Sequence, residues 1–401
     1  MEQLRSAFKR MAGRIIAAVR SRLPKRLQAR VFGRPRGFVA VETLRSTLGC
    51  AVEWLRSGET SSGAEPQTIE DELHWKFQAP YYRHWHHSDV WVARLDHGYI
   101  RGGRYALTDD HFLIEDVISA PNDRIDLDGD FATHAPLVRH ETHRDVALLG
   151  TRWADSHYHW LMDVLPRAGI LEDCSAGTEE IAHYAIPEAA IPQHTEALRL
   201  LGIGEERLLR LGPGDQIRVE DLIVPSLPEV RGNPNRWVCE FLRERFLAKA
   251  SSDAEHPERI YVERRGKREV KNQKAVDKVL ARHGIEKVRL EEHRFVAQVA
   301  MFQNAELVVG PHGAGLTNIV FASPGMKVVE IFSPNYVNVC NANIASRLDV
   351  TYSYLVGRGP RPPVGVDPCH VFEDVMVDVE QLDAWLSGFA RLDVEAAGES
   401  R

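Results

Sequence analysis

The sequence has 401 residues, with 44% hydrophobic and 27% charged side chains, which predicts a soluble protein of more than one domain. No stretch approaches 18 consecutive apolar residues, so no transmembrane helix is expected. Five cysteines without a CxxC pair argue against a disulfide scaffold or a zinc knuckle and fit a reducing compartment. The net charge of −7 argues against nucleic-acid binding.

Basic residues gather at the start of the chain. Residues 1–36 hold eleven Lys/Arg and one acid, Glu2, whereas the rest of the chain is acidic. Apolar side chains recur there at helical spacing up to Pro24, which predicts a basic amphipathic helix that binds an anionic membrane surface through residues 1–23. We therefore expect a cytoplasmic protein held peripherally on the inner face of the cytoplasmic membrane. A solvated or partner-bound helix and an organellar transit peptide are the alternatives.

The remaining chain predicts an α/β fold with two Rossmann-like domains. Hairpin signals between Asp89 and Val117 precede alternating strands and helices over residues 145–235, and a second such series runs over residues 259–332. The segment 228–235 is the best candidate for a hinge. We predict a basic arm over residues 1–36, a first domain over 37–232, a second over 233–375, and a terminal helix and tail over 376–401 that packs back on the first domain. Ligands of such folds bind at the carboxyl ends of the strands, which predicts a cleft between the domains.

A glycine-rich turn lies between the predicted strands Glu306–Gly310 and Lys327–Phe332, in the stretch VVGPHGAGLTNIVF. Backbone N–H groups and the positive end of a helix at such a turn suit a phosphate. Gly313 and Gly315 would allow close approach, and His312 would add a hydrogen bond or a charge. The stretch matches neither GxGxxG nor a Walker loop, and a tight turn with a satisfied histidine is the alternative.

Five basic residues follow an earlier predicted strand, Ile260–Glu263, in the stretch ERRGKREVKN. Arg264 and Arg268 are four residues apart and suit bidentate hydrogen bonds to one diphosphate. The alternative is a solvated run of charge. Because both stretches follow strands of one predicted domain, we expect them to meet at one edge of its sheet.

The stretch DSHYHWLMDVLPR predicts a helix that carries a histidine–carboxylate pair. His159 and Asp163 are four residues apart, and an imidazole oriented by a carboxylate is a competent general base near neutral pH. Pro166 is expected to kink or stop this helix. A structural His–Asp pair is one alternative, and a metal site with His157 and Asp155 is another.

Four blocks of the sequence resemble the family 61 glycosyltransferases: YHWLMDVLPR, IYVERRGKREVKN, AQVAMFQNAELVVGPHGAGLTNIVFASPG and VVEIF. The resemblance covers about residues 90–345. It implies a metal-independent, inverting enzyme of the two-domain GT-B type, of the bacterial capsular or exopolysaccharide kind. It further implies a nucleotide-sugar donor, no cofactor and no divalent metal. The first domain would then lie on the acceptor side, and the second would bind the nucleotide sugar.

The resemblance also implies roles for particular residues. Contacts with the donor diphosphate and nucleotide fall to Arg264, Arg268, Asn272, His312, Gly313, Ala314, Gly315, Leu316 and Glu330. The catalytic candidates are Asp163 and His159, with His157 and Arg167 on the acceptor side. Glu263 departs from the family, which often has Ser there. Because an acid would repel a diphosphate, Glu263 is expected to point away or to contact ribose.

The predicted reaction is direct displacement at the anomeric carbon of the donor. Asp163 or His159 deprotonates an acceptor hydroxyl, and the nucleoside diphosphate leaves against the arginines and the turn. The predicted function is transfer of a hexose or pentose to a glycan or lipid-linked acceptor in cell-surface polysaccharide biosynthesis. One alternative is a non-catalytic polysaccharide-assembly scaffold with a transferase fold. The other is a nucleotide-dependent oxidoreductase or epimerase, and the missing GxGxxG motif argues against this second alternative.

Overall fold

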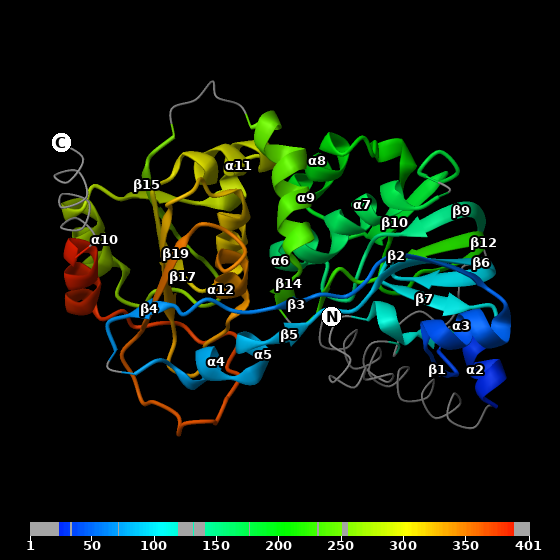
Figure 1. The fold of residues 1–401 in the computed structure, drawn as a ribbon, viewed down its shortest axis with the longest axis horizontal. Helices are drawn as coiled ribbons and strands as arrows, with labels where there is room; N and C mark the ends of the chain where they lie inside the picture. The colour runs from blue at the N-terminus through cyan, green and yellow to red at the C-terminus, as the bar shows by residue number, and fades with distance from the viewer. Residues whose placement is uncertain are drawn as a thin grey trace, which may run out of the picture. The chain divides into compact units, whose positions relative to one another are not determined.

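The computed structural model describes residues 24–32, 34–70, 72–118, 131, 141–175, 177–230, 232–250 and 256–388. The chain forms two compact units (Figure 1), the first of Met1–Gly58 and Ser88–Val230 and the second of Glu59–His87 and Arg231–Arg401. The arm predicted over residues 1–23 lies outside the described residues. Among the helices that are described, none is long and apolar enough to cross a membrane.

The first unit contains a nine-stranded mixed sheet. Its path runs β1-β8-β7-β6-β12-β9-β10-β11, and β2 pairs with β6. The strands are β1 (Gly37–Val39), β2 (Ala51–Arg56), β6 (Val90–Arg101), β7 (Tyr105–Thr108), β8 (Phe112–Ile114), β9 (Thr142–Leu148), β10 (His183–Pro187), β11 (Leu208–Leu211) and β12 (Gln216–Pro225). The predicted hairpin is β6–β7, turned by Gly102 and Gly103 with φ of 59° and 65°. The predicted parallel part is β12-β9-β10-β11.

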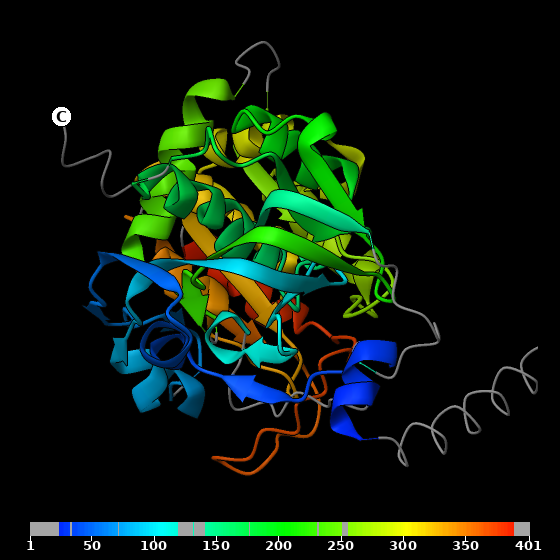
Figure 2. The same ribbon diagram turned by 90° about the vertical axis from the view of Figure 1, so that its right-hand side faces the viewer.

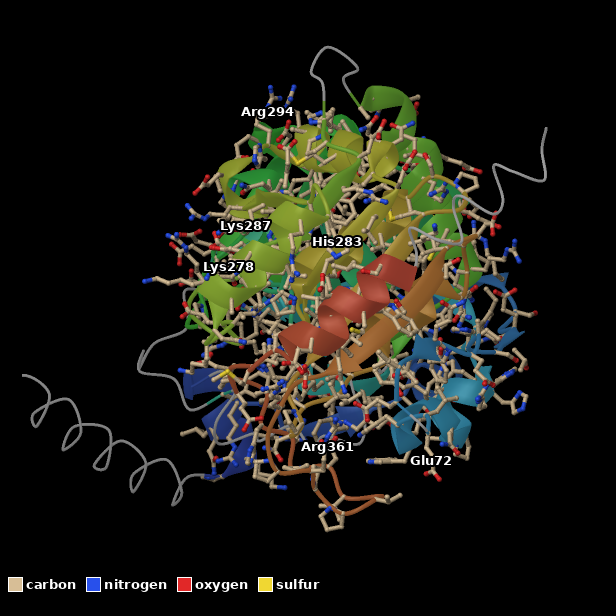
Figure 3. All side chains as sticks on the ribbon, turned by 90° about the vertical axis from the view of Figure 1, so that its left-hand side faces the viewer. Glu72, Lys278, His283, Lys287, Arg294 and Arg361 are labelled. Atoms are coloured by element: carbon tan, nitrogen blue, oxygen red, sulfur yellow. The ribbon has the colours of Figure 1, made fainter. Side chains whose placement is uncertain are left out.

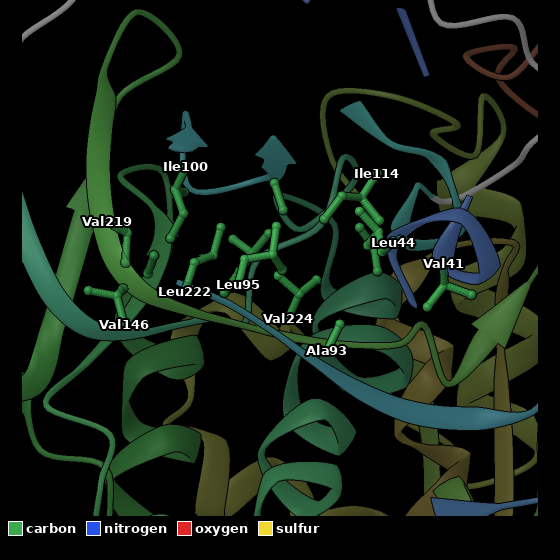
Figure 4. Packing of buried hydrophobic residues seen from close by; sticks show 14 of the residues in the cluster. Val41, Leu44, Ala93, Leu95, Ile100, Ile114, Val146, Val219, Leu222 and Val224 are labelled. Carbon is green, nitrogen blue, oxygen red and sulfur yellow. The ribbon is translucent and has the colours of Figure 1, made fainter. Parts of the chain in front are cut away.

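The first unit also contains helices. They are α2 (Lys25–Phe32), α3 (Val41–Leu48), η1 (Glu115–Val117), α6 (His157–His159), the π-helical turn η2 (Trp160–Val164), α7 (Leu165–Asp173), α8 (Pro192–Leu200) and η3 (Glu205–Arg207). Of these, α3 and α7 contact strands of this sheet. Asp116 begins α3 by accepting a hydrogen bond from the Val41 N–H at 2.7 Å. Figure 4 shows Val41 and Leu44 of α3 packing with buried side chains of β6, β8 and β12, such as Leu95 and Val224.

The second unit contains a six-stranded sheet in which every pair is parallel, in the order β16-β15-β17-β18-β19-β4. The strands are β15 (Arg259–Val262), β16 (Glu286–Val288), β17 (Leu307–Pro311), β18 (Lys327–Phe332), β19 (Thr351–Val356) and β4 (Gln67–Thr68). Counted along the chain from β15, the first five strands have the order 2-1-3-4-5, which is a doubly wound, Rossmann-like order. Its switch point lies between β15 and β17.

Helices cover both faces of this sheet (Figure 1). The elements are α4 (Trp75–Gln78), α5 (Pro80–Arg83), α9 (Arg236–Phe246), η4 (Leu247–Lys249), α10 (Gln273–Arg282), η5 (Leu290–Glu292), α11 (Phe295–Asn304), the 3₁₀ helix η6 (Ala314–Phe321), α12 (Cys340–Ala345) and a helix over residues 379–388. Short strands β3 (Thr60–Ser61) and β5 (Trp85–His86) pair with each other, and β13 (Glu229–Val230) and β14 (Asn233–Pro234) flank the chain crossing. The predicted α/β class is therefore confirmed.

Residues 59–87 correct the predicted boundaries, which placed them in the domain 37–232. They belong to the second unit, where β4 pairs with the edge strand β19. Phe77 stacks on Tyr354 with ring centroids 4.6 Å apart. Pairing with β4 covers a strand edge that would otherwise be open, which is a long-range contact that local sequence patterns do not reveal. The chain passes from the first unit to the second between Val230 and Arg231, which lies within the segment 228–235.

The terminal helix also differs from its prediction. Residues 379–388 pack in the second unit rather than on the first, because Leu382 and Leu386 join the core formed by α10 and the sheet. The Nε2 atom of His283 lies 2.8 Å from Asp383 Oδ1 and ties this helix to the end of α10. Figure 3 shows His283 beside this helix, drawn in red.

Candidate active site

The switch point of the second unit brings the two predicted anion-binding stretches together. β15 and β17 are neighbouring parallel strands, with Ile260 opposite Val308, so their carboxyl ends open on the same edge. Arg264 follows β15, and His312 to Gly315 follow β17. A hollow of about 250 Å³ opens here. It is lined by Val262, Glu263, Arg264, Arg265, Leu290, Glu291, Pro311, Gly313, Gly315 and Leu316. This is the edge at which doubly wound folds bind ligands.

Gly313 leaves room for the close packing of the Arg264 guanidinium, and its backbone angle does not itself call for glycine. A Cβ atom at Gly313 would overlap Nη1 of Arg264, and one at Gly315 would lie 3.0 Å from Cδ1 of Leu290. The N–H groups of Gly313, Ala314 and Gly315 donate no backbone hydrogen bond among the described residues. They stand at the start of η6, so they are available to an anion. The predicted helix after the turn is thus a 3₁₀ helix of eight residues.

The two arginines lie close together without a carboxylate partner among the described residues. Arg264 donates from Nε to the Lys267 carbonyl at 2.6 Å. Burial, and next the neighbouring Arg268, lower the pKa of Arg264 to about 10, against opposing effects of Tyr336 and Glu291. Arg264 therefore stays charged at neutral pH, and the repulsion between the two guanidinium groups favours a bound anion.

Arg268 adopts a strained backbone conformation. Its φ of 58° is in the left-handed region that non-glycine residues rarely occupy. The guanidinium carbon lies 5.5 Å from the centroid of the Tyr336 ring, and the buried Nε has no hydrogen-bond partner in the described part of the chain. Such strain clusters at ligand sites, where surrounding contacts hold it in place.

His312 is held by a buried network of polar side chains. Its Nδ1 lies 2.6 Å from Oε1 of Glu330, which is fully buried. Asn341 of α12 donates to the same oxygen at 2.7 Å, and the hydroxyl of Tyr352 donates to Oε2. Because an ionised carboxylate only accepts, the Nδ1 of His312 carries a proton and Nε2 is its other polar atom. Glu330 therefore positions His312 and is itself fully buried, and its predicted role in donor binding stays a prediction.

The surroundings of His312 act on its protonation in opposite directions. Burial lowers the pKa of the imidazole, and the nearby Arg268 and Arg264 lower it as well. Glu330 raises it through charge and a hydrogen bond. The net effect is a pKa below the ordinary value, so the imidazole is neutral at pH 7 in the ligand-free protein.

Asn272 and Glu263 have structural partners. The side chain of Asn272 donates to the Val377 carbonyl at 2.8 Å and accepts from the Val377 N–H at 3.0 Å. Its amide is thus bonded to the backbone of Val377, and its predicted role in donor binding stays a prediction. Glu263 points to Arg289, with Lys287 3.8 Å away. These cations neutralise the acid, so it does not oppose an anion in the hollow.

The first unit holds the predicted histidine–carboxylate pair on an irregular helix. Nδ1 of His159 lies 2.8 Å from Oδ2 of Asp163, which is fully buried, whereas the His159 side chain is 25% exposed. A π-helical turn covers Trp160–Val164, and the helix continues through Pro166 instead of stopping there. The wider π turn accommodates the missing N–H of the proline, and such turns occur frequently at functional sites.

Arg167 binds backbone carbonyls of the first unit, and its predicted place on the acceptor side stays a prediction. The guanidinium is fully buried and donates to the carbonyls of Leu149, Gly150 and Pro225. Burial lowers the pKa of Arg167 to about 9, and Asp163 acts in the opposite direction. The side chain therefore connects β9, β12 and α7 around the base of the His159 helix.

His157 is part of a stack of three rings. It stacks on His194 of α8 with centroids 5.7 Å apart, and Trp160 stacks on the other side at 4.3 Å. His194 is 1% exposed, and neither ring nitrogen has a hydrogen-bond partner among the described residues. Burial, and next His157, lower the pKa of His194 to about 2.

This stack predicts a loss of stability in acid. An unfolded histidine titrates near pH 6.5, so as the pH falls below about 6.5 the unfolded chain gains a proton that folded His194 does not. The contribution of neutral His194 to the free energy of unfolding is fully present above about pH 6.5 and falls progressively below it. Wild type should lose about 2 kcal/mol more between pH 7 and pH 5 than His194→Phe, which keeps a stacked ring. Urea unfolding of both proteins at the two pH values measures this, and an equal loss in both would contradict it.

The metal alternative and the cysteines can be compared with the described residues. Within the described ranges, no group of three or more His, Cys, Asp or Glu side chains is placed to hold a metal ion. The five cysteines are all free. Sequence analysis missed Asn341, Tyr336 and Tyr352, although an asparagine within a buried apolar helix is a signal that could have indicated Asn341.

The comparison with known families bears on this geometry. Residues 157–329 match the family model Glycosyltransferase 61. The matched range includes both the His159–Asp163 pair and the arginine and glycine stretches of the hollow. The match supports the predicted resemblance to this family and a glycosyltransferase role. No curated protein matches the chain.

Proposed function

We propose that this chain is an inverting glycosyltransferase of the GT-B type, which transfers a sugar from a nucleotide sugar to a glycan or lipid-linked acceptor. The observation that carries the proposal is the anion site at the switch point of the second unit. There Arg264 packs against Gly313 beside the N–H groups of residues 313–315, and Arg268 lies near Arg264; neither guanidinium has a carboxylate partner among the described residues. The family match over residues 157–329 supports it.

The donor would bind with its diphosphate against this site. Arg264 and Arg268 suit bidentate hydrogen bonds to phosphate oxygens, and the N–H groups of the turn add uncharged donors. A bound diphosphate would also reverse the electrostatics at Nε2 of His312, since a negative neighbour favours the imidazolium that the arginines disfavour. The leaving diphosphate would then be stabilised by the protein's own donors, and this proposal assigns no role to a divalent metal.

The acceptor hydroxyl would be activated from the first unit. Because Asp163 accepts the Nδ1 proton of His159, Nε2 of that imidazole is the free basic atom. His159 is partly exposed and Asp163 is buried, so we assign His159 as the general base and Asp163 as the residue that positions it. In the proposed reaction the acceptor hydroxyl attacks the anomeric carbon from the face opposite the leaving group.

The biological setting is part of the same proposal. We propose a role in cell-surface polysaccharide biosynthesis by a peripheral protein on the cytoplasmic face of the membrane. The support is the family resemblance together with the basic composition of residues 1–36.

Nucleotide binding tests the proposed function. Thermal unfolding should be followed in EDTA with UDP, GDP, CMP, NAD and NADP. One of UDP, GDP or CMP at about 100 times its dissociation constant should stabilise the protein by about 2.7 kcal/mol. Stabilisation by NAD or NADP alone would favour an oxidoreductase, and no response to any nucleotide would favour a scaffold. Either result would overturn the proposal.

The packing of Gly313 gives a second test of the donor site. Gly313→Ala should displace Arg264 and weaken binding of the stabilising nucleotide by about 10- to 100-fold, because a charge-assisted hydrogen bond is lost. Isothermal titration calorimetry measures the affinity. Gly388→Ala is the matched control, since a Cβ at this helical position meets nothing within 4 Å. Unchanged affinity in Gly313→Ala would show that Arg264 does not contact the nucleotide.

A further inference from the structure

The loop that follows β19 exposes an unusual number of apolar side chains. Val364 is 88% exposed, Phe372 is 63%, Val366 is 48% and Met376 is 43%. In the described part of the second unit, four of the five exposed large hydrophobic residues lie on this loop, which we define as residues 357–376. A concentration of exposed apolar side chains on one segment marks a surface that contacts something other than water.

The charged groups of this loop are already paired within the second unit. The pairs are Arg358 with Asp378, Arg361 with Glu70, Asp367 with Lys76, and Asp374 with Lys271, and Glu373 accepts from Ser333 and Asn335. These contacts hold the loop in one shape. The apolar side chains of the loop are exposed and have no such partners. Figure 3 shows the loop as the orange trace that continues below the labelled Arg361.

The loop backbone is suited to a partly dehydrated environment. Four of its residues are prolines without an N–H: Pro360, Pro362, Pro363 and Pro368. Further N–H groups already donate hydrogen bonds, at Arg358, Val366, Cys369, His370, Val371 and Glu373. The N–H groups of other loop residues, those of Val364, Gly365 and Phe372 among them, donate no hydrogen bond among the described residues, so the loop backbone suits the partly hydrated headgroup level rather than the nonpolar interior of a bilayer.

The loop lies at the same edge of the sheet as the anion site. It leaves the carboxyl end of β19, and its residue Val375 bridges to Val270 and accepts a hydrogen bond from the Lys271 N–H at 2.9 Å. The ammonium of Lys267 lies 4.1 Å from the centroid of the Phe372 ring. Phe372 and Lys267 thus share one surface of the second unit, and Phe372 lies on the same loop as Val364 and Val366.

We propose that residues 357–376 dock the second unit on the surface of a phospholipid bilayer. Val364, Val366 and Phe372 enter the interface, while Lys267 and Arg361 lie at the level of the headgroups. A bilayer fits better than a protein partner because the apolar side chains project singly from a loop. A stable protein interface needs a contiguous complementary surface of roughly 800 Å² on each partner, whereas a fluid interface accepts single side chains. This surface is separate from residues 1–23.

The exposed cysteine of the loop provides a local reporter. Cys369 is exposed, whereas Cys50 and Cys340 are half-buried and Cys174 and Cys239 are buried. An environment-sensitive NBD label on Cys369 of the full chain should gain about twofold in emission on vesicles of phosphatidylcholine with about a third phosphatidylglycerol. A nitroxide-labelled lipid should quench that emission. Cys369→Ser, labelled in the same way, corrects for the other cysteines.

Substitution separates docking by the loop from binding by residues 1–23. Val364→Asp with Val366→Asp should abolish the emission gain and lower vesicle affinity by about tenfold, whereas Ile191→Asp, at an exposed apolar residue of the first unit, should do neither. Vesicle binding without a change in NBD emission would overturn the proposal, as would no vesicle binding. An emission gain without lipid that grows with protein concentration would assign the surface to a second copy of the chain and would also overturn it.

Discussion

Arg268→Ala is expected to reduce sugar transfer by about 100- to 1000-fold, which is the usual cost of removing one donor that stabilises charge on a leaving group. Its guanidinium is beside that of Arg264 and has no carboxylate partner among the described residues, so no protein group would replace it. The rate of nucleoside diphosphate release from the preferred nucleotide sugar measures this effect. Most of the loss should appear in kcat, because charge on the leaving diphosphate develops in the transition state.

The control for this prediction is Lys271→Ala. Lys271 belongs to the same basic stretch and carries the same charge, but it pairs with Asp374 at 2.6 Å. Its substitution should leave the rate nearly unchanged. If both variants lost activity equally, a general electrostatic effect would replace the specific role of Arg268. Addition of EDTA to wild type should have no effect, and loss of activity with rescue by Mn²⁺ would contradict metal independence.

Removal of the base in the first unit has the second large expected effect. His159→Ala should lower kcat by about 100- to 10,000-fold, as expected for loss of general base catalysis. Asp163→Asn should have a comparable effect, because an amide at this position no longer holds the Nδ1 proton of His159 and disfavours the imidazolium that forms. Nucleotide affinity, which depends on the second unit, should stay within about twofold of wild type in both variants.

A second histidine–carboxylate pair gives the matched control. His283 and Asp383 lie 2.8 Å apart in the second unit, the same distance that separates His159 and Asp163. His283→Ala removes an equivalent hydrogen bond at a place where we assign no chemistry. It should lower stability without lowering kcat. Near-normal activity in both His159→Ala and Asp163→Asn would remove that pair from the mechanism.

Local patterns were sufficient to predict the parallel sheet of the second unit and the proximity of Arg264 to the glycine turn. The strands β15, β17 and β18 are apolar runs bounded by turn residues, and their alternation with helices predicts a parallel sheet. In such a sheet neighbouring strands end at the same edge. This reasoning placed Arg264 near Gly313, where the structure has them in direct packing.

Contacts distant along the chain were the part that sequence patterns could not predict. β4 joins the sheet of the second unit from residues 67–68, which precede most of the first unit in the sequence. The predicted donor contacts of Glu330 and Asn272 depend in the same way on partners far along the chain, Tyr352 and Val377. A buried polar residue and a ligand-binding one have the same local signature, so only the identity of the partner distinguishes them.

The central claim is tested most directly by nucleotide release in EDTA, measured for wild type and Arg268→Ala side by side. The panel contains UDP-, GDP- and CMP-linked sugars. The released product is a nucleoside diphosphate from the first two and CMP from the third. The account predicts that wild type turns over one donor without metal and that Arg268→Ala does so about 100- to 1000-fold more slowly. No release from any donor, release that requires added metal, or equal rates in the two proteins would contradict it.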